Sequence, residues 1–313
     1  MGYLGFLGFK MADKKRGEIT SKQLVTIIIL IVSFSVILIF FFSLDLQRGI
    51  SDDACRNSVI LRSKLPVIGE GVKLNCKTNY ICISREDECK ESTKDTTTIK
   101  VKDKNEIIEA LADLMRDCWW KMGEGDVDYS RGVDLTTENY CAVCDVVHFD
   151  ESIKNNEELN KLTYKEFYFY LSNKKVPNKD ESYLYYLTGF SDLTSERARL
   201  LQSEEKVDIF DEKYFFNLAD DKGYALVTGI SKKGWRNTLG SALGAGGVLA
   251  FIGGVVGNVP GAVIGLVLGG GGTGTVAYYI EKPGSIQQMY PVFIQYDAKS
   301  LENLNCKEFS TLA

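Results

Sequence analysis

Cysteine is the residue type in this sequence with the widest choice of chemistry. The chain has eight cysteines and one histidine, His148, and two of the cysteines form a CxxC motif, Cys141 and Cys144 in YCAVCD. Thiols at this spacing can exchange disulfides, can hold zinc, or can belong to two separate structural disulfides. With a single imidazole, the sequence excludes a metal site built on several histidines.

The residues around this motif predict a strand, and a strand favours the structural role. The segment AVCDVVHF alternates and is rich in β-branched residues. In a strand, Cys141 and Cys144 point to opposite faces, which suits two different disulfide partners. A redox-active CxxC normally lies between a strand and the helix that follows it. Two alternatives stay open: a redox pair formed by these two cysteines, and half of a zinc site completed by His148 and one further cysteine.

We expect all the cysteines to join a disulfide framework. Their number is even, and the cluster LNCKTNYICISREDECK has little apolar content with which to hold a fixed shape. On this interpretation the chain uses no catalytic residue, no cofactor and no metal, and spacing leaves the pairing open. The disulfide candidates are Cys55, Cys76, Cys82, Cys89, Cys118, Cys141, Cys144 and Cys306.

An apolar segment before the cysteines predicts the compartment in which they lie. Leu24–Leu44 is an uncharged run of 21 residues, and a helix of that length spans about 30 Å, the hydrocarbon thickness of a bilayer. The basic run KKR at 14–16 and Lys22 precede it, whereas Asp45 follows it. The positive-inside rule then places the N-terminus in the cytoplasm and the cysteines outside, where disulfides persist.

The residues before this segment resemble a known type of signal sequence. KKRGEITSKQL followed by an apolar run resembles the class III, prepilin-type signal of archaeal pilins and related surface proteins. The resemblance implies cleavage after Gly17 and a pilin-like subunit. The sequence has Lys22 at the fifth position after that bond, where the family usually has glutamate. We therefore favour an uncleaved signal anchor and keep the pilin-like subunit as an alternative.

The segment between the anchor and residue 236 predicts a mixed α+β domain. The clearest element is a helix over Lys104–Met122, with Asp103 as its N-cap, a capping-box-like Glu106 and Gly123 as a left-handed C-cap. Its apolar stripe includes Cys118 and Trp119, so we expect this cysteine to be buried and disulfide-bonded. Further helices are predicted at 164–173 and 181–187, whose aromatic residues we assign to the core, and a strand at 224–230. Another strand is predicted at 291–296, in the C-terminal tail.

Residues 237–280 contain no charged side chain and have glycines at four-residue spacing. Glycines four apart line one helix face and let helices pack closely in a membrane. The stretch resembles the glycine-zipper hairpins of several membrane-associated families, which implies two transmembrane helices with a turn near 258–261 and self-association through the GxxxG faces. The helix-packing candidates are Gly240, Gly244, Gly253, Gly257, Gly261, Gly265 and Gly269.

These elements define the expected organisation of the chain. It comprises a cytoplasmic segment 1–23, a transmembrane helix 24–44, an extracytoplasmic cysteine-rich domain 45–236, the membrane hairpin 237–280, and an extracytoplasmic tail 281–313 that packs on the domain. With CWWKMGEG and YCAVCD, the whole resembles uncharacterised membrane-anchored surface proteins of archaea.

The net charge of -5 and pI near 5.2 argue against a nucleic-acid partner. We expect a multi-pass cell-surface binding or scaffold protein without catalytic activity. Its expected partners are the lipid bilayer and either a homo-oligomer or another membrane protein. The alternative is a membrane-tethered thiol-disulfide oxidoreductase that uses Cys141 and Cys144.

Overall fold

A computed structural model describes most of the chain, which divides into two units, Met1–Ile50 and Ser51–Ala313. The fold is mixed α+β, as predicted. The described residues are 21–43, 46–64, 73–89, 95–130, 139–189, 212, 215–231, 248–252, 262–268, 274–282, 286–303 and 306–308.

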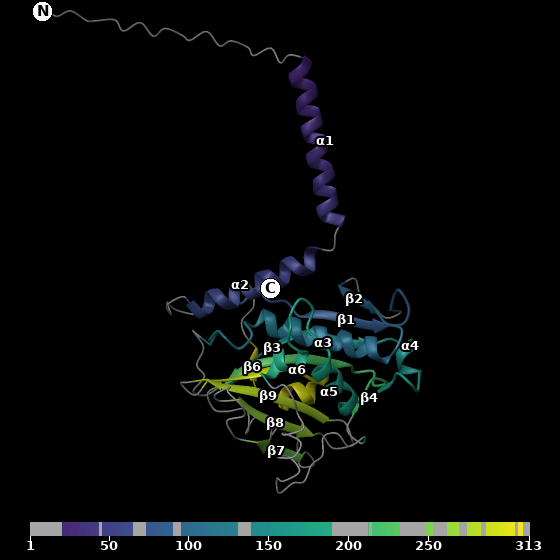
Figure 1. Cartoon of the computed structure of the whole chain (residues 1–313), viewed down its shortest axis with the longest axis vertical. Coiled ribbons are helices and arrows are strands. Elements are labelled where there is room, and N and C mark those ends of the chain that lie inside the picture. The colour runs from purple at the N-terminus through teal and green to yellow at the C-terminus, as the bar shows by residue number, and fades with distance from the viewer. Residues whose placement is uncertain are drawn as a thin grey trace, which may run out of the picture. The chain divides into compact units, whose positions relative to one another are not determined.

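The first unit contains helix α1, Ser21–Ser43 (Figure 1). Its described large apolar side chains, from Leu24 to Val36, are all exposed, and Leu30 is 63 % exposed. Within the residues that the structure describes, none of the helices has both the length and the apolar composition needed to cross a bilayer. The transmembrane assignment of 24–44 therefore stays a prediction, and the proposed cleavage site at Gly17 lies outside the described residues.

The second unit is built on one mixed sheet. In the described part of the chain nine strands join it, in the order β2-β1-β3-β6-β10-β9-β8-β7, and β11 pairs with the beginning of β3. The strands β2, β1 and β3 are parallel, and from β3 onward each neighbour is antiparallel. The strands are β1 Asn79–Ser84, β2 Thr96–Lys100, β3 Asn139–Phe149, β6 Tyr224–Ser231, β7 Val248–Ile252, β8 Ala262–Leu268, β9 Gly274–Lys282, β10 Ile286–Gln295 and β11 Cys306–Glu308.

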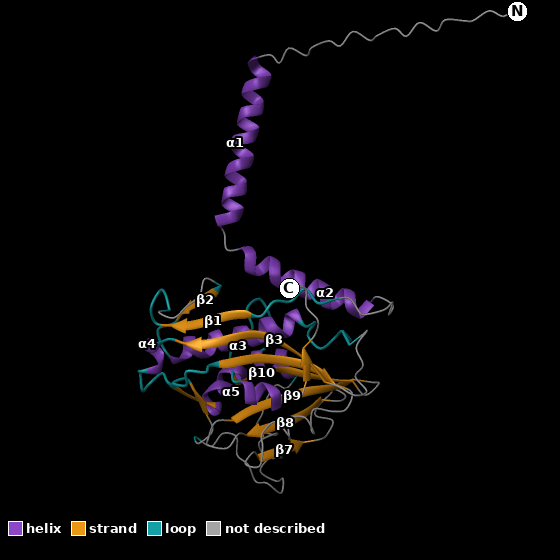
Figure 2. Ribbon diagram, turned by 180° about the vertical axis from the view of Figure 1, so that it is seen from behind, coloured by secondary structure: helices purple, strands orange, loops and turns teal. Residues whose placement is uncertain are grey.

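Helices cover one face of this sheet. In Figure 1 helices α3, α5 and α6 lie in front of the strands, and Figure 2, seen from behind, shows the strands in front of the helices. Helix α3 contacts β3, β6 and β10. The helices are α2 Leu46–Lys64, α3 Lys104–Lys121, α4 Glu151–Lys154, α5 Tyr164–Asn173, α6 Tyr183–Thr188 and α9 Ala298–Asn303, and a separate pair of strands is β4 Lys161–Thr163 and β5 Phe215–Asn217.

Helix α3 agrees closely with the sequence prediction. Asp103 accepts a hydrogen bond from the backbone N–H of Glu106 at 3.0 Å, which satisfies one of the free donors at the helix start. Gly123, with φ of 82°, follows the C-cap, and this left-handed conformation favours glycine. Trp119 is 2 % exposed and stacks on Tyr290 of β10 at a centroid distance of 4.7 Å. The apolar stripe therefore packs on the sheet.

The predicted aromatic core is also largely present. Phe167 of α5 packs edge-on against Phe216 of β5 at 5.6 Å, and Phe216 meets Phe293 of β10 at 6.2 Å. Phe167, Tyr168 and Tyr183 are buried, whereas two aromatic residues of these helices, Phe169 and Tyr185, are exposed. The aromatic residues at 167–170 and 183–186 thus divide between core and surface by helix face.

The glycine-rich segment 237–280 is not a pair of helices in its described part. Its described residues form β7, β8 and the greater part of β9, and Gly265 lies in β8 opposite Phe251 and Ala277. The error has a physical cause, because residues four apart share one face in a strand as well as in a helix. Valine and isoleucine favour strands, and glycine disfavours a helix interior. The other six candidate glycines lie outside the described residues.

Candidate functional site

The disulfides determine what the cysteines can do. Three bridges are described, Cys55–Cys76, Cys82–Cys89 and Cys118–Cys144. The predicted disulfide framework is therefore present for these six cysteines, and Cys118 is fully buried as expected. Cys76 precedes β1, and the bridge to Cys55 joins α2 to that segment.

The CxxC cysteines are not bonded to each other. Cys144 in β3 is bonded to Cys118 in α3, and Cys141 is also disulfide-bonded. Their exposed fractions are 4 % for Cys141 and 3 % for Cys144. Disulfide exchange needs an accessible thiolate, and zinc binding needs free thiolates. In this arrangement neither cysteine supplies one. His148 is half-buried, and its ring meets Tyr296 at 6.0 Å, edge to face.

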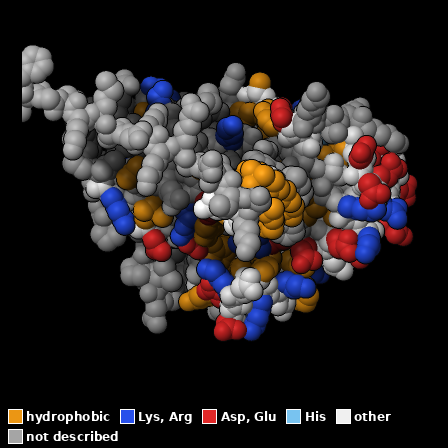
Figure 3. Space-filling view, turned by 90° about the horizontal axis from the view of Figure 1, so that it is seen from above, with side chains coloured by type: hydrophobic (Ala, Val, Ile, Leu, Met, Phe, Trp, Pro, Cys, Tyr) orange, Lys and Arg blue, Asp and Glu red, His pale blue; other side chains and the backbone are white. Residues whose placement is uncertain are grey.

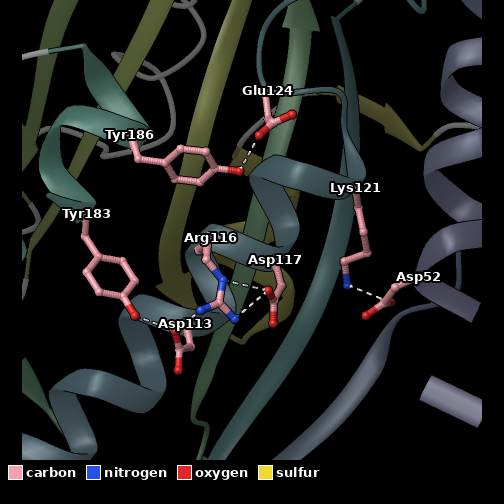
Figure 4. Close-up of polar contacts among 8 residues, drawn as sticks. All are labelled: Asp52, Asp113, Arg116, Asp117, Lys121, Glu124, Tyr183 and Tyr186. Carbon is pink, nitrogen blue, oxygen red and sulfur yellow. Dashed lines mark hydrogen bonds and ion pairs between the residues drawn. The ribbon is translucent and has the colours of Figure 1, made fainter. Parts of the chain in front are cut away.

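A polar cluster that sequence reasoning missed lies along α3. We use the name polar cluster for Arg56, Asp113, Arg116, Asp117, Glu124, Lys179, Tyr183 and Tyr186, most of which Figure 4 shows. Arg116 lies between Asp113 and Asp117, and its Nε donates to Asp117 Oδ1 at 2.9 Å. Tyr183 of α6 donates to Asp113 Oδ1 at 2.6 Å. This half of the cluster ties α6 to α3.

Glu124 is the centre of the other half. Its Oε1 accepts a hydrogen bond from Tyr186 at 2.7 Å, and its Oε2 accepts one from Arg56 at 2.8 Å. Lys179 lies 3.4 Å from the same carboxylate and 4.2 Å from the centroid of the Tyr186 ring. The Arg56 guanidinium also lies over Trp120, 4.6 Å from the ring centroid. One carboxylate therefore holds α2, α6 and the segment after α3 together.

The backbone of Glu124 is unusual. Its φ is 55°, between Gly123 at 82° and Gly125 at 75°. A non-glycine residue in this left-handed region costs on the order of 1–2 kcal/mol. Such residues persist where the surroundings over-determine them, and here the carboxylate has three polar partners. The GEG segment of CWWKMGEG is the sequence signal that points to this position.

The protonation states of Glu124, Tyr183 and Tyr186 suit a role in holding elements together. Burial opposes ionisation of Glu124, but the hydrogen bonds from Tyr186 and Arg56 outweigh it and lower its pKa. Burial, together with the Glu124 carboxylate, raises the pKa of Tyr186, and burial with Asp113 raises that of Tyr183. At neutral pH Glu124 therefore accepts a hydrogen bond, and Tyr183 and Tyr186 donate. A general base would need a free carboxylate near its working pH.

Among the described side chains on the face that Figure 3 shows, acidic and basic groups are interspersed. A nucleic-acid interface would be expected to gather lysine and arginine. Comparisons with protein-family models, with curated proteins and with solved structures find no match to the chain. The case for a function rests on the chemistry of this molecule alone.

Proposed function

We propose that this chain is a membrane-anchored cell-surface protein whose disulfide-bridged domain binds or scaffolds and does not catalyse. The observation that carries the proposal is the set of three disulfides in the unit that follows α1. Disulfides of this number are typical of an oxidising compartment and rare in the cytosol. A route out of the cytosol is therefore required for the domain.

The exposed apolar surface of helix α1 is consistent with a membrane anchor. Ten large apolar side chains between Leu24 and Val36 are exposed. Each square ångström of apolar surface kept in water costs about 25 cal/mol, so such a surface calls for a lipid or protein neighbour. In α1 the last side chain that the structure describes is Val36, and the apolar run of the sequence continues to Leu44. The basic residues before the run favour a cytoplasmic N-terminus and an extracytoplasmic domain.

The engaged state of the CxxC cysteines and of the polar-cluster carboxylates supports a binding or scaffold role. Cys141 and Cys144 are in disulfides, and the carboxylates of the polar cluster are engaged by arginine and tyrosine donors. An oxidoreductase would have to open the buried Cys118–Cys144 bridge before it could react. A rigid domain held by covalent bridges presents a fixed surface, and a scaffold requires such a surface.

Cysteine labelling tests this proposal. Cells that express the full chain are treated with a membrane-impermeant maleimide, with and without prior reduction. We expect no labelling before reduction and strong labelling after it, without permeabilisation. Labelling without reduction, seen only in permeabilised cells, would show free cytoplasmic thiols and would overturn the proposal. The variant Ala12→Cys is a matched control, since its thiol precedes the basic run and should react only after permeabilisation.

A further inference from the structure

A hollow of about 540 Å³ opens on the surface beside the first turn of α5. It lies where the start of α5, the start of α3 and strand β4 meet. Phe169 is one wall of this hollow and is 71 % exposed, the most exposed of the described large apolar side chains. The other lining residues are Thr163 and the charged residues Lys104, Glu157, Glu158, Lys161, Lys165, Glu166 and Glu212.

The fold of this chain does not account for Phe169. Helix α5 buries Phe167, Tyr168 and Leu171 against the core, and Phe169 projects from the opposite face. A polar side chain at this position would leave the core unchanged. A single exposed apolar residue is common on protein surfaces. Here, however, the residue borders a hollow of about 540 Å³.

The charges around the hollow have both signs. Lys104 pairs with Glu166 at 3.2 Å, and Lys161 lies over the Phe215 ring at 4.2 Å. Within the described residues, Lys165, Glu157 and Glu158 form no ion pair. These three side chains are exposed. The rim therefore has unpaired positive and negative groups next to each other.

We propose that a second copy of this chain docks on this hollow about a two-fold axis. A two-fold interface places a surface against itself, so it must contain both a projecting group and a space for that group, and charges of both signs. Phe169 is the projecting group, and the hollow is the space that receives it. The positive charge is that of Lys165, and the negative charges are those of Glu157 and Glu158. In the dimer each Phe169 enters the hollow of the other copy, and the rim charges pair across the interface. This inference does not depend on the membrane anchor.

Zero-length crosslinking tests the dimer directly. Full-length chains with natural nitrogen and with ¹⁵N are mixed in detergent, exchanged and treated with a carbodiimide, which joins lysine to glutamate in contact. We expect mixed-isotope peptides that link Lys161 or Lys165 of one copy to Glu157 or Glu158 of the other. If these links occur only between peptides of the same isotope, the two copies do not meet at this surface and the inference is wrong.

Two substitutions distinguish a dimer formed at the hollow from a dimer formed at another surface. Phe169→Glu should lower the yield of crosslinked dimer about tenfold, because central aromatic residues dominate interfaces. Tyr80→Glu changes an aromatic residue of β1 that is 43 % exposed and lies outside the hollow, and it should leave the yield unchanged. Equal yields for Phe169→Glu and the wild type would refute the proposed interface.

A charge exchange provides a readout that misfolding cannot imitate. Lys165→Glu alone, and Glu157→Lys with Glu158→Lys, should each weaken self-association, since like charges then meet across the axis. A mixture of these two variants should recover the crosslinked dimer, because each copy then faces opposite charges. A mixture no better than either variant would contradict the proposed pairing.

Discussion

At the scale of single residues, Glu124 shows how a strained position is maintained. Its left-handed backbone lies between two glycines of positive φ, and its carboxylate has contacts with Tyr186, Arg56 and Lys179. The contacts offset the strain, because they are made by the side chain of the residue whose backbone is strained. Loss of the charge should therefore leave the strain without compensation.

The pH dependence of stability should report on Glu124. Its pKa in the folded chain is lowered from the ordinary value near 4.5. A lowered pKa contributes stability above that value, and the contribution is lost as the pH falls through the folded-state pKa. We expect the free energy of unfolding to fall less between about pH 5 and pH 3 in Glu124→Gln than in the wild type. Denaturant melts at several pH values measure this, and identical slopes would contradict the assignment.

The left-handed backbone of Gly123 leads to a second prediction, which concerns the stability of Gly123→Ala. Its φ is 82°, and a Cβ there would lie 2.2 Å from Val127 Cγ2. Gly123→Ala should cost at least about 1–2 kcal/mol from the backbone alone, with a steric cost in addition. Adding Val127→Ala should recover only the steric part. Thermal unfolding of both variants gives the two contributions, and a neutral Gly123→Ala would show that the turn rearranges freely.

At the scale of elements, α2 is held to the domain by an ion pair as well as by a disulfide. Lys121 at the end of α3 is 4 % exposed at its side chain, and its Nζ lies 3.3 Å from Asp52 Oδ1 (Figure 4). Asp52→Ala leaves this ammonium group buried and unpaired, at a cost of about 3 kcal/mol. The double variant Asp52→Leu, Lys121→Met should recover most of that loss in chemical denaturation. No recovery would mean that the pair also sets the position of α2.

The disulfides differ in the stability they should contribute. Cys118–Cys144 closes a separation of 26 residues and Cys82–Cys89 one of 7. Loop-closure entropy gives about 3.5 kcal/mol for the first bridge and about 2.4 kcal/mol for the second. Paired alanine variants should follow this order in their unfolding midpoints, and the reverse order would indicate that packing around the sulfurs dominates.

Sequence patterns predicted α3 and strands β3 and β6 better than the glycine-rich part of the sheet. The stripe and caps of α3 are local signals, so Asp103, Trp119 and Gly123 identified that element with its ends. The glycine spacing in 237–280 suits both helix and strand, and only pairing with distant strands decides between them. The polar cluster was missed for a similar reason. Glu124, Arg56 and Tyr186 are far apart in the sequence and meet only after α2, α3 and α6 have packed.

At the scale of the whole molecule, the remaining cysteines predict one more bridge. Cys141 is disulfide-bonded, and Cys306 is the one other cysteine of the sequence that the three described bridges do not use. Strand β11, which begins at Cys306, pairs in parallel with β3, with Glu308 opposite Cys141. We expect peptide mass spectrometry under non-reducing conditions to find Cys141 joined to Cys306. A peptide in which Cys141 carries an alkylating tag without reduction would disprove the pairing.

The sheet order has a consequence for biogenesis. Strand β10 lies between β6 and β9, and α3 rests on it, yet translation reaches β10 only after nearly every other element. Until β10 has been synthesised, Trp119 of α3 lacks the Tyr290 ring against which it packs. The central part of the sheet can therefore be completed only after residues 286–295 have left the ribosome.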